Sequence, residues 1–117
     1  MELSQFEAVL QEAIDSLPDW VHKALDNIEV LVLDKPDKNL DPEEEGPLGL
    51  YVGVPLPERG AEYAGHLPDV IYIFRQPHLE LDLPSSELRA EIARTLIHEI
   101  AHYFGIDDDH LDEIGWG

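Results

Sequence analysis

The sequence predicts an α+β fold, with two N-terminal helices, a small mixed or antiparallel sheet of about three to four strands, and a long C-terminal helix packed on that sheet. Apolar residues recur at helical spacing near both ends of the chain. Between them lie runs rich in β-branched residues, which is typical of strands. The 117 residues, 44% hydrophobic and 28% charged, suit one globular domain spanning residues 1–117.

Two helices are expected before the first strand. In residues 4–16, Ser4 can cap the helix, and Glu7 lies three positions later as in a capping box. The apolar residues of this segment follow helical spacing: Phe6, Val9, Leu10, Ala13, Ile14 and Leu17. Pro18 then interrupts, and residues 19–27 are expected to form a short second helix with this proline near its start.

Three segments have the composition of β-strands. Residues 28–34 (IEVLVLD) are rich in β-branched side chains, and residues 48–56 (LGLYVGVPL) form a weaker candidate because they contain two glycines. Residues 69–75 (DVIYIFR) are the most strand-like run in the chain. Residues 35–47 are acidic and contain proline, with no apolar periodicity, so we expect a loop there. Residues 58–68 are expected to form another loop, and residues 76–84 lead into the last helix.

The last helix is expected to begin at Ser85 or Ser86 and to end at Gly105. At about 100° per residue, its apolar side chains cover a wide arc: Ala90, Ile92, Ala93, Leu96, Ile97, Ile100, Tyr103 and Phe104. The remainder is a narrow polar strip: Thr95, His98, Glu99 and His102. Because so apolar a helix must be largely buried, we expect this strip to line a cleft rather than to face open solvent.

The polar strip contains the pattern H-E-x-x-H. His98 and His102 lie about one turn apart on the same helical face, so both imidazoles can bind one Zn²⁺ at about 2.0–2.1 Å. Glu99 points to the side of the metal, where it can accept a proton from a zinc-bound water whose pKa the metal lowers towards about 7. The pattern therefore predicts a catalytic zinc site with Glu99 as general base.

A catalytic zinc needs a third protein ligand. Gly105 can end the helix in a left-handed conformation and turn the chain back, so that Asp108 faces the metal. Asp107, Asp109 and His110 are alternatives, and His110 is attractive because imidazole is a good zinc ligand, although its offset from the glycine suits the turn less well. The acidic segment lacks the glycine and final glutamate of a calcium-binding EF-hand loop.

The other histidines are expected at the surface. His22 falls in the short second helix, and His66 and His78 fall in loops. Any of the loop histidines, Arg75 or Tyr103 could approach the cleft and stabilise an oxyanion, and the sequence does not select among them. Tyr103 belongs to the apolar arc and is expected in the core.

The composition narrows the possible classes of protein. The absence of cysteine excludes disulfides and thiolate zinc sites, so a metal must be held by His, Asp or Glu. A formal net charge of -19 disfavours binding to nucleic acid or to an anionic membrane. The N-terminus lacks the basic region of a secretory signal, and no apolar stretch is long enough to span a bilayer. We therefore expect a cytoplasmic protein with neither nucleic acid nor membrane as a partner.

Residues 48–116 resemble the small bacterial minimal zincins, a family of zincin-like metallopeptidases. Three stretches carry the resemblance: HEIAHYFGIDDDHLDEIGW (98–116), GLYVGVPLPERG (49–60) and LPDVIYIFRQP (67–77). The pattern H-E-x-x-H-x-x-G-x-x-D is also similar to that of the Asp-zincins, whose third zinc ligand is the aspartate. The resemblance implies Glu99 as the catalytic base and the zinc ligands His98, His102 and Asp108.

The resemblance also implies how a substrate is held. In zincin-type folds an edge strand above the active-site helix pairs with an extended peptide, and residues 69–75 are the candidate here. The larger metzincins place a methionine beneath the zinc, but the only methionine of this chain is Met1. We therefore expect the floor of the site to come from Leu111, Ile114 and Trp116.

The implied function is that of a zinc-dependent metallopeptidase, which hydrolyses peptide bonds in small peptides or unfolded proteins through a zinc-bound water activated by Glu99. The alternative is a non-catalytic zincin-like module that binds a metal or a peptide.

Overall fold

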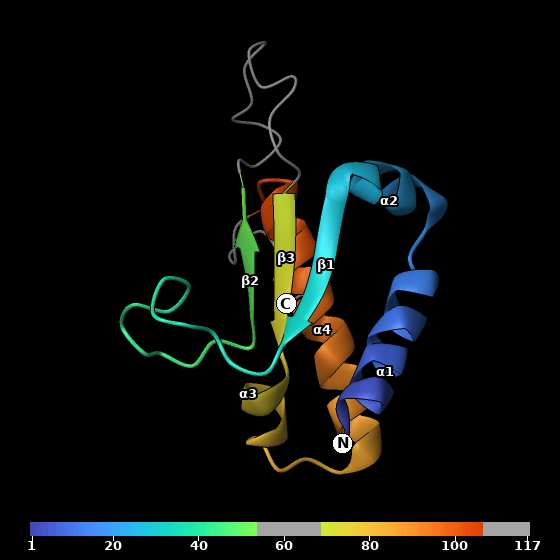
Figure 1. Ribbon diagram of the computed structural model, residues 1–117. Helices are drawn as coiled ribbons and strands as arrows, with labels where there is room; N and C mark the ends of the chain where they lie inside the picture. The colour runs from blue at the N-terminus through green and yellow to red at the C-terminus, as the bar shows by residue number, and fades with distance from the viewer. Residues whose placement is uncertain (54–68, 107–117) are drawn as a thin grey trace.

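The computed structural model describes residues 1–53 and 69–106, and these form the α+β fold that the sequence predicts (Figure 1). In chain order the elements are α1 (Leu3–Asp15), α2 (Asp19–Ala24), the 3-10 turn η1 (Leu25–Asn27), β1 (Ile28–Leu33), β2 (Gly49–Val52), β3 (Asp69–Phe74), α3 (Arg75–Leu79) and α4 (Ser85–Tyr103). Within the described residues, no helix is both long and apolar enough to cross a membrane.

The described strands form one mixed sheet in the order β1-β3-β2. β3 pairs in parallel with β1, with Val30 opposite Ile71, and antiparallel with β2, with Tyr51 opposite Ile71. The prediction that residues 69–75 form an edge strand is therefore wrong, because β3 is hydrogen-bonded on both sides. Among the described strands, β3 is central, and β1 and β2 are the edge strands.

Helix α4 runs behind β3 in Figure 1 and packs on one face of the sheet, and α1 packs against α4. The side chains on that face are buried in the core, as period-two alternation along β3 requires: Asp69, Ile71 and Ile73. On the opposite face, Leu31, Leu33 and Val52 keep 36–43% of their surface exposed. The sheet therefore contributes mainly one of its faces to the core.

The core joins helices from both ends of the chain to β3. Its fully or nearly buried members are Phe6, Val9, Leu10, Val21, Ile71, Ile73, Leu88, Ile92, Leu96 and Ile100. This cluster confirms the apolar periodicity of α1 and, at Ile92, Leu96 and Ile100, that of α4. Ala90, which the sequence also assigned to the apolar arc of α4, is exposed. The cap of α1 differs from the prediction, because Glu2 is the N-cap and its N–H donates to Gln5 Oε1 at 3.4 Å, whereas Ser4 and Glu7 lie inside the helix.

The C-terminus of α4 ends as the sequence predicts, at a glycine with a left-handed backbone. Gly105 has φ 79°, its N–H donates to His102 O at 2.9 Å, and the Ile106 N–H donates to Ala101 O at 2.9 Å. These two bonds form a Schellman motif, which satisfies carbonyls of the last turn that have no partner within the helix. The chain is thereby turned back directly after the histidines of the H-E-x-x-H pattern.

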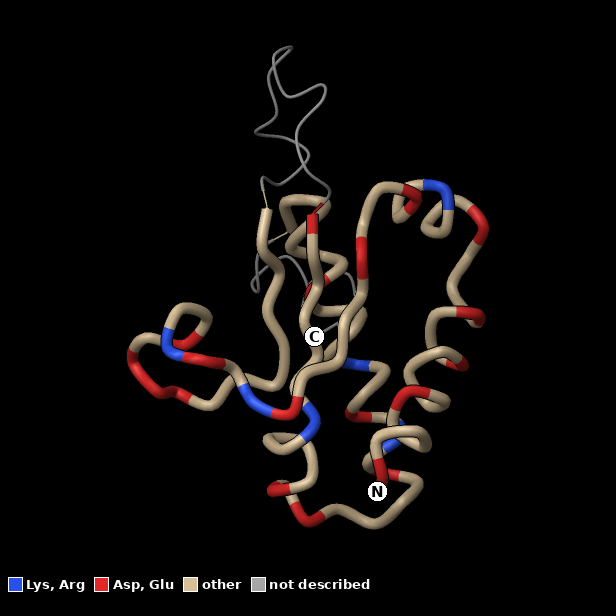
Figure 2. Tube along the Cα trace, viewed as in Figure 1, with Lys and Arg blue, Asp and Glu red and all other residues tan. Residues whose placement is uncertain are grey.

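Charged residues are spread over the molecule rather than gathered in one place. Figure 2 shows acidic residues on the helices, on the start of β1 and on the loop before β2. In this loop the acidic residues outnumber the basic ones. In that loop, Asp41 accepts the backbone N–H groups of Glu45 and Gly46, so part of its carboxylate charge organises local backbone.

Candidate metal centre

Helix α4 brings His98, Glu99 and His102 to one place. Each offers one potential ligand atom, and these atoms all lie within 4.8 Å of one another. The two imidazole rings are 4.6 Å apart between centroids, and His102 Nδ1 lies 3.3 Å from Glu99 Oε1. The predicted cluster is therefore present, and it follows directly from the i, i+4 spacing of the histidines on one helix face.

The Glu99 carboxylate is held by the edge of the sheet. Glu99 is only 6% exposed, and its Oε1 accepts the backbone N–H of Tyr51 in β2 at 2.9 Å. A buried carboxylate requires hydrogen-bond partners, and this amide supplies one. The bond ties α4 to β2 at the position where the sequence predicts the general base.

Close packing of β2 on α4 depends on Gly49. A Cβ atom at this position would lie 2.8 Å from Thr95 Cγ2, 3.0 Å from the Tyr72 carbonyl oxygen and 3.3 Å from Glu99 Cγ. The glycine lets the strand approach the polar strip of the helix more closely than any residue with a side chain.

A pocket of about 330 Å³ opens beside the cluster. Residues of α4 and of the segment that enters β2 line it: Pro47, Leu48, Gly49, Glu91, Arg94, Thr95, His98 and Glu99. The prediction that the polar strip lines a cleft is confirmed for Thr95, His98 and Glu99. This volume is at the lower end of the range found for ligand pockets, and the apolar wall of the pocket comes from Pro47 and Leu48.

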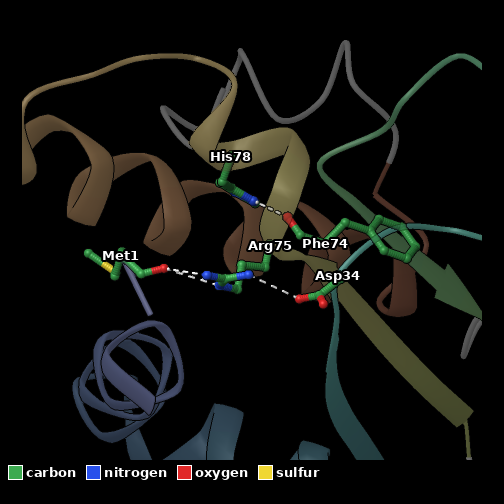
Figure 3. Close-up of polar contacts among 5 residues, drawn as sticks. All are labelled: Met1, Asp34, Phe74, Arg75 and His78. Atoms are coloured by element: carbon green, nitrogen blue, oxygen red, sulfur yellow. Dashed lines mark hydrogen bonds and ion pairs between the residues drawn. The ribbon is translucent and has the colours of Figure 1, made fainter. Parts of the chain in front are cut away.

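His78 is not at the surface, and that prediction is wrong. His78 was expected to lie in a loop, but α3 forms directly after β3 and carries it into the core with no exposed surface. Its Nδ1 lies 2.7 Å from the Phe74 carbonyl oxygen (Figure 3), and its Nε2 lies 2.9 Å from Thr95 Oγ1. Burial lowers the pKa of His78 below its usual 6.5, although the Phe74 carbonyl and the charge of Glu91 oppose that shift.

Arg75 has a structural role in the described chain. Its Nε and Nη2 donate to the Met1 carbonyl at 3.1 and 2.8 Å, and Nη1 contacts Asp34 at 3.2 Å (Figure 3). Tyr103 is 4% exposed, which confirms its place in the core, and its hydroxyl donates to the Ala24 carbonyl. His22 is exposed on α2, as predicted.

Several predicted site residues lie outside the described residues. These are the third ligand Asp108, its alternatives Asp107, Asp109 and His110, and also His66, Leu111, Ile114 and Trp116. The roles of these residues stay predictions.

Two residues that support the cluster, one directly and one through the other, were not identified from the sequence. Tyr51 acts through its backbone N–H, which every residue except proline has, so no side-chain pattern could reveal it. Asp69 is 3% exposed and accepts the Tyr51 hydroxyl at 2.6 Å, and a Cβ added at Gly53 would collide with its carboxylate. For Asp69 the sequence offered one signal, an aspartate at the start of a strand. Its partner, Tyr51 of β2, could not be predicted because the contact depends on the register of the sheet.

The donor set of the cluster suits zinc. Two imidazoles on one helix face are borderline-soft ligands of the kind that Zn²⁺ prefers, and the chain has no thiolate to offer. In a zinc site of this pattern His98 and His102 would be the ligands, and Glu99 would stay beside the metal.

The fold and the histidine cluster together define a zincin-like domain, and comparison with known proteins gives the family. A model of the zincin-like metallopeptidase family matches residues 25–116. The chain belongs to this family. No curated protein matches it.

A solved structure has a similar fold. A conserved hypothetical protein from Thermo thermophilus is 22% identical in sequence and superposes with a TM-score of 0.58, over 97% of each chain. The likeness extends over nearly the full length of both chains, so the N-terminal helices belong to the shared fold as well as the strands and α4.

Proposed function

We propose that this protein is a zinc-dependent peptidase that hydrolyses peptide bonds in small peptides or unfolded proteins of the cytoplasm. The observation that supports this most directly is the position of Glu99, between the two histidines in sequence and beside them in space, at the edge of β2. A metal site that only stabilises the fold needs no buried carboxylate next to its ligands. A hydrolase needs one as a base.

The chemistry divides between the metal and the chain. Bound zinc would supply a Lewis acid and lower the pKa of water at the site to about 7. Glu99 accepts the proton of the attacking water and delivers it to the amine that leaves when the C–N bond breaks. The His98 and His102 imidazoles hold the metal on the same helix face, so the base and the ligands keep a fixed spacing.

The position of the substrate follows from β2. Because β3 is central, β2 is the strand whose outer edge lies next to Glu99 and to the pocket. An extended peptide added to that edge would place one side chain in the pocket formed by Pro47, Leu48 and Thr95. The volume of the pocket is at the lower end of the range for ligand pockets, so we expect contacts close to the cleaved bond to dominate selectivity.

A non-catalytic module that binds metal or peptide is the second candidate, and the small size of this pocket favours it. The two functions differ in whether Glu99 is needed for turnover.

Glu99→Gln distinguishes the two functions. The variant keeps the shape and a hydrogen-bond acceptor but cannot take a proton, so hydrolysis of a peptide library should fall by about a hundredfold or more. Zinc content after dialysis should stay equal to that of the wild type, because the imidazoles are unchanged. Zinc-loaded wild-type protein that cleaves no member of a diverse library would exclude the peptidase.

A further inference from the structure

The two edges of β2 can be assigned from its hydrogen bonds. In an antiparallel pair, successive residues direct their backbone groups alternately toward the partner strand and away from it. The Leu48 carbonyl accepts the Phe74 N–H at 2.9 Å, so Leu48, Leu50 and Val52 face β3. Gly49 and Tyr51 therefore direct their N–H and C=O groups to the outer edge.

At this outer edge, the Tyr51 N–H donates to Glu99 Oε1 at 2.9 Å. A backbone N–H that points away from its own sheet is the group that an added strand uses to bind a peptide carbonyl. The Glu99 carboxylate thus occupies the position that a substrate carbonyl would take. One N–H proton makes one well-aligned hydrogen bond, so the two acceptors exclude each other.

We infer that Glu99 and the backbone of an extended peptide compete for the Tyr51 N–H, so that Glu99 is released as a base when a peptide strand pairs with β2. The inference rests on the proposed function, since it concerns how a peptide engages the same site. Without peptide, the bond keeps the buried carboxylate partnered and covers one donor of the edge strand. With peptide, the carbonyl replaces Oε1 and the carboxylate can turn toward the reacting water.

Peptide binding to metal-free protein tests the competition without any hydrolysis. The probe is a short, uncharged fluorescent peptide of alternating valine and threonine, followed by anisotropy. Glu99→Ala removes the competing acceptor and should bind the peptide about tenfold more tightly than the wild type, the equivalent of one hydrogen bond to a charged group. Glu99→Gln keeps a weaker, neutral acceptor and should lie between them.

Glu87→Gln is the matched control. Glu87 carries the same charge on the same helix, but it is exposed in the first turn of α4 and does not line the pocket. Its removal should change the affinity for the peptide by less than about twofold, as for a screened surface charge. Equal affinities of wild type and Glu99→Ala, or an equal gain in Glu87→Gln, would overturn the inference.

Hydrogen exchange of the Tyr51 amide, measured by NMR on the same metal-free proteins, reports on the bond itself. In Glu99→Ala this amide should exchange about tenfold faster or more, while the Leu50 amide, which faces β3, should be unchanged. Saturating peptide should slow Tyr51 again. If Tyr51 exchanges at the same rate in both proteins, the inference fails, whereas failure of the peptidase proposal appears only in the zinc-loaded cleavage assay.

Discussion

At the scale of single residues, the contacts of His78 fix the tautomer of its neutral ring. The Phe74 carbonyl can only accept, so Nδ1 of His78 must carry a proton. In the neutral ring Nε2 is then an acceptor, and the Thr95 hydroxyl must donate to it. If the ring becomes charged, both nitrogens donate and the Thr95 hydroxyl turns to its other partner, the Glu91 carbonyl, at 3.0 Å. Burial favours the neutral form, as the lowered pKa of His78 indicates.

His78 should therefore make the protein less stable in mild acid. The pKa of His78 is lowered in the folded state, and in the unfolded chain it is about 6.5. Between these two values the unfolded chain binds more protons, so this contribution is complete above pH 6.5 and is lost as the pH falls through the folded pKa. The loss amounts to at most about 1.4 kcal/mol per pH unit within that interval.

Urea unfolding at pH 7.5 and at pH 5.5 measures this effect. His78→Gln keeps hydrogen-bonding capacity but does not titrate, so its free energy of unfolding should fall less over this range than that of the wild type. The carboxylates titrate in both proteins and also change the free energy of unfolding. The effect of His78 is therefore the difference between the pH dependence of the wild type and that of His78→Gln. Parallel curves would show that His78 does not contribute.

The identity of the third zinc ligand, predicted to be Asp108 rather than His110, is also decided by single residues. The turn at Gly105 is present, and Asp108 follows it by three residues. Asp108→Ala should weaken zinc binding by more than about a hundredfold, whereas His110→Ala should have a small effect. Competition with a chelating dye measures both affinities. Equal losses, or a greater loss in His110→Ala, would reverse the assignment.

The sequence predicted that His98, Glu99 and His102 lie together because they follow one another on a single helix. His98, Glu99 and His102 depend only on local spacing, which 3.6-residue periodicity fixes. His78 and Tyr51 depend on contacts between segments distant in the chain, with Thr95 in one case and Glu99 in the other. Such contacts require the packing of α3 and β2 on α4, which no local pattern contains.

At the scale of elements, the same limit explains the wrong position of β3. A strand's place in a sheet is decided by its non-local partners, and residues 69–75 were chosen as the edge strand from the expected substrate geometry. The composition did hold a signal, because DVIYIF is an almost unbroken apolar run, which is typical of strands buried in the middle of a sheet. β1 alternates between intermediate and exposed residues, as an edge strand often does.

The contact between β2 and α4 makes a prediction about Gly49. Gly49→Ala would place a methyl group against Thr95 Cγ2 and the Tyr72 carbonyl, so β2 must move away from the helix. We expect a loss of about 1–3 kcal/mol in unfolding free energy, as for other overpacked positions. Faster exchange of the Tyr51 amide should accompany it, because the bond to Glu99 lengthens. Val52→Ala, on the exposed side of the same strand, is the control and should cost under about 1 kcal/mol.

At the scale of the whole molecule, the acidic surface affects both stability and binding. The full sequence has a formal net charge of -19, and in the described residues the acidic side chains are distributed over helices and loops (Figure 2). Such a charge repels itself in the compact state and attracts cations, including divalent metal ions and basic peptides. Added salt screens both effects, because the Debye length falls from about 10 Å at 0.1 M to about 3 Å at 1 M.

Zinc should stabilise the whole fold, because its predicted histidine ligands lie on the helix that contributes most to the core. His98 and His102 lie in the last turns of α4, whose apolar residues fill the core against α1 and β3. A metal that binds only the folded state at one hundred times its dissociation constant adds about 2.7 kcal/mol to the free energy of unfolding. Zinc should raise the midpoint of thermal unfolding by roughly ten degrees relative to chelator-treated protein.

The controls for this last prediction separate the ligands from the base. His98→Ala and His102→Ala should abolish the zinc-dependent shift, because each removes an imidazole ligand from the cluster. Glu99→Gln should retain the shift, because Glu99 is predicted to act on water rather than to bind the metal. Loss of the shift in Glu99→Gln would identify Glu99 as a metal ligand, and the site would then lack the separate base that hydrolysis requires.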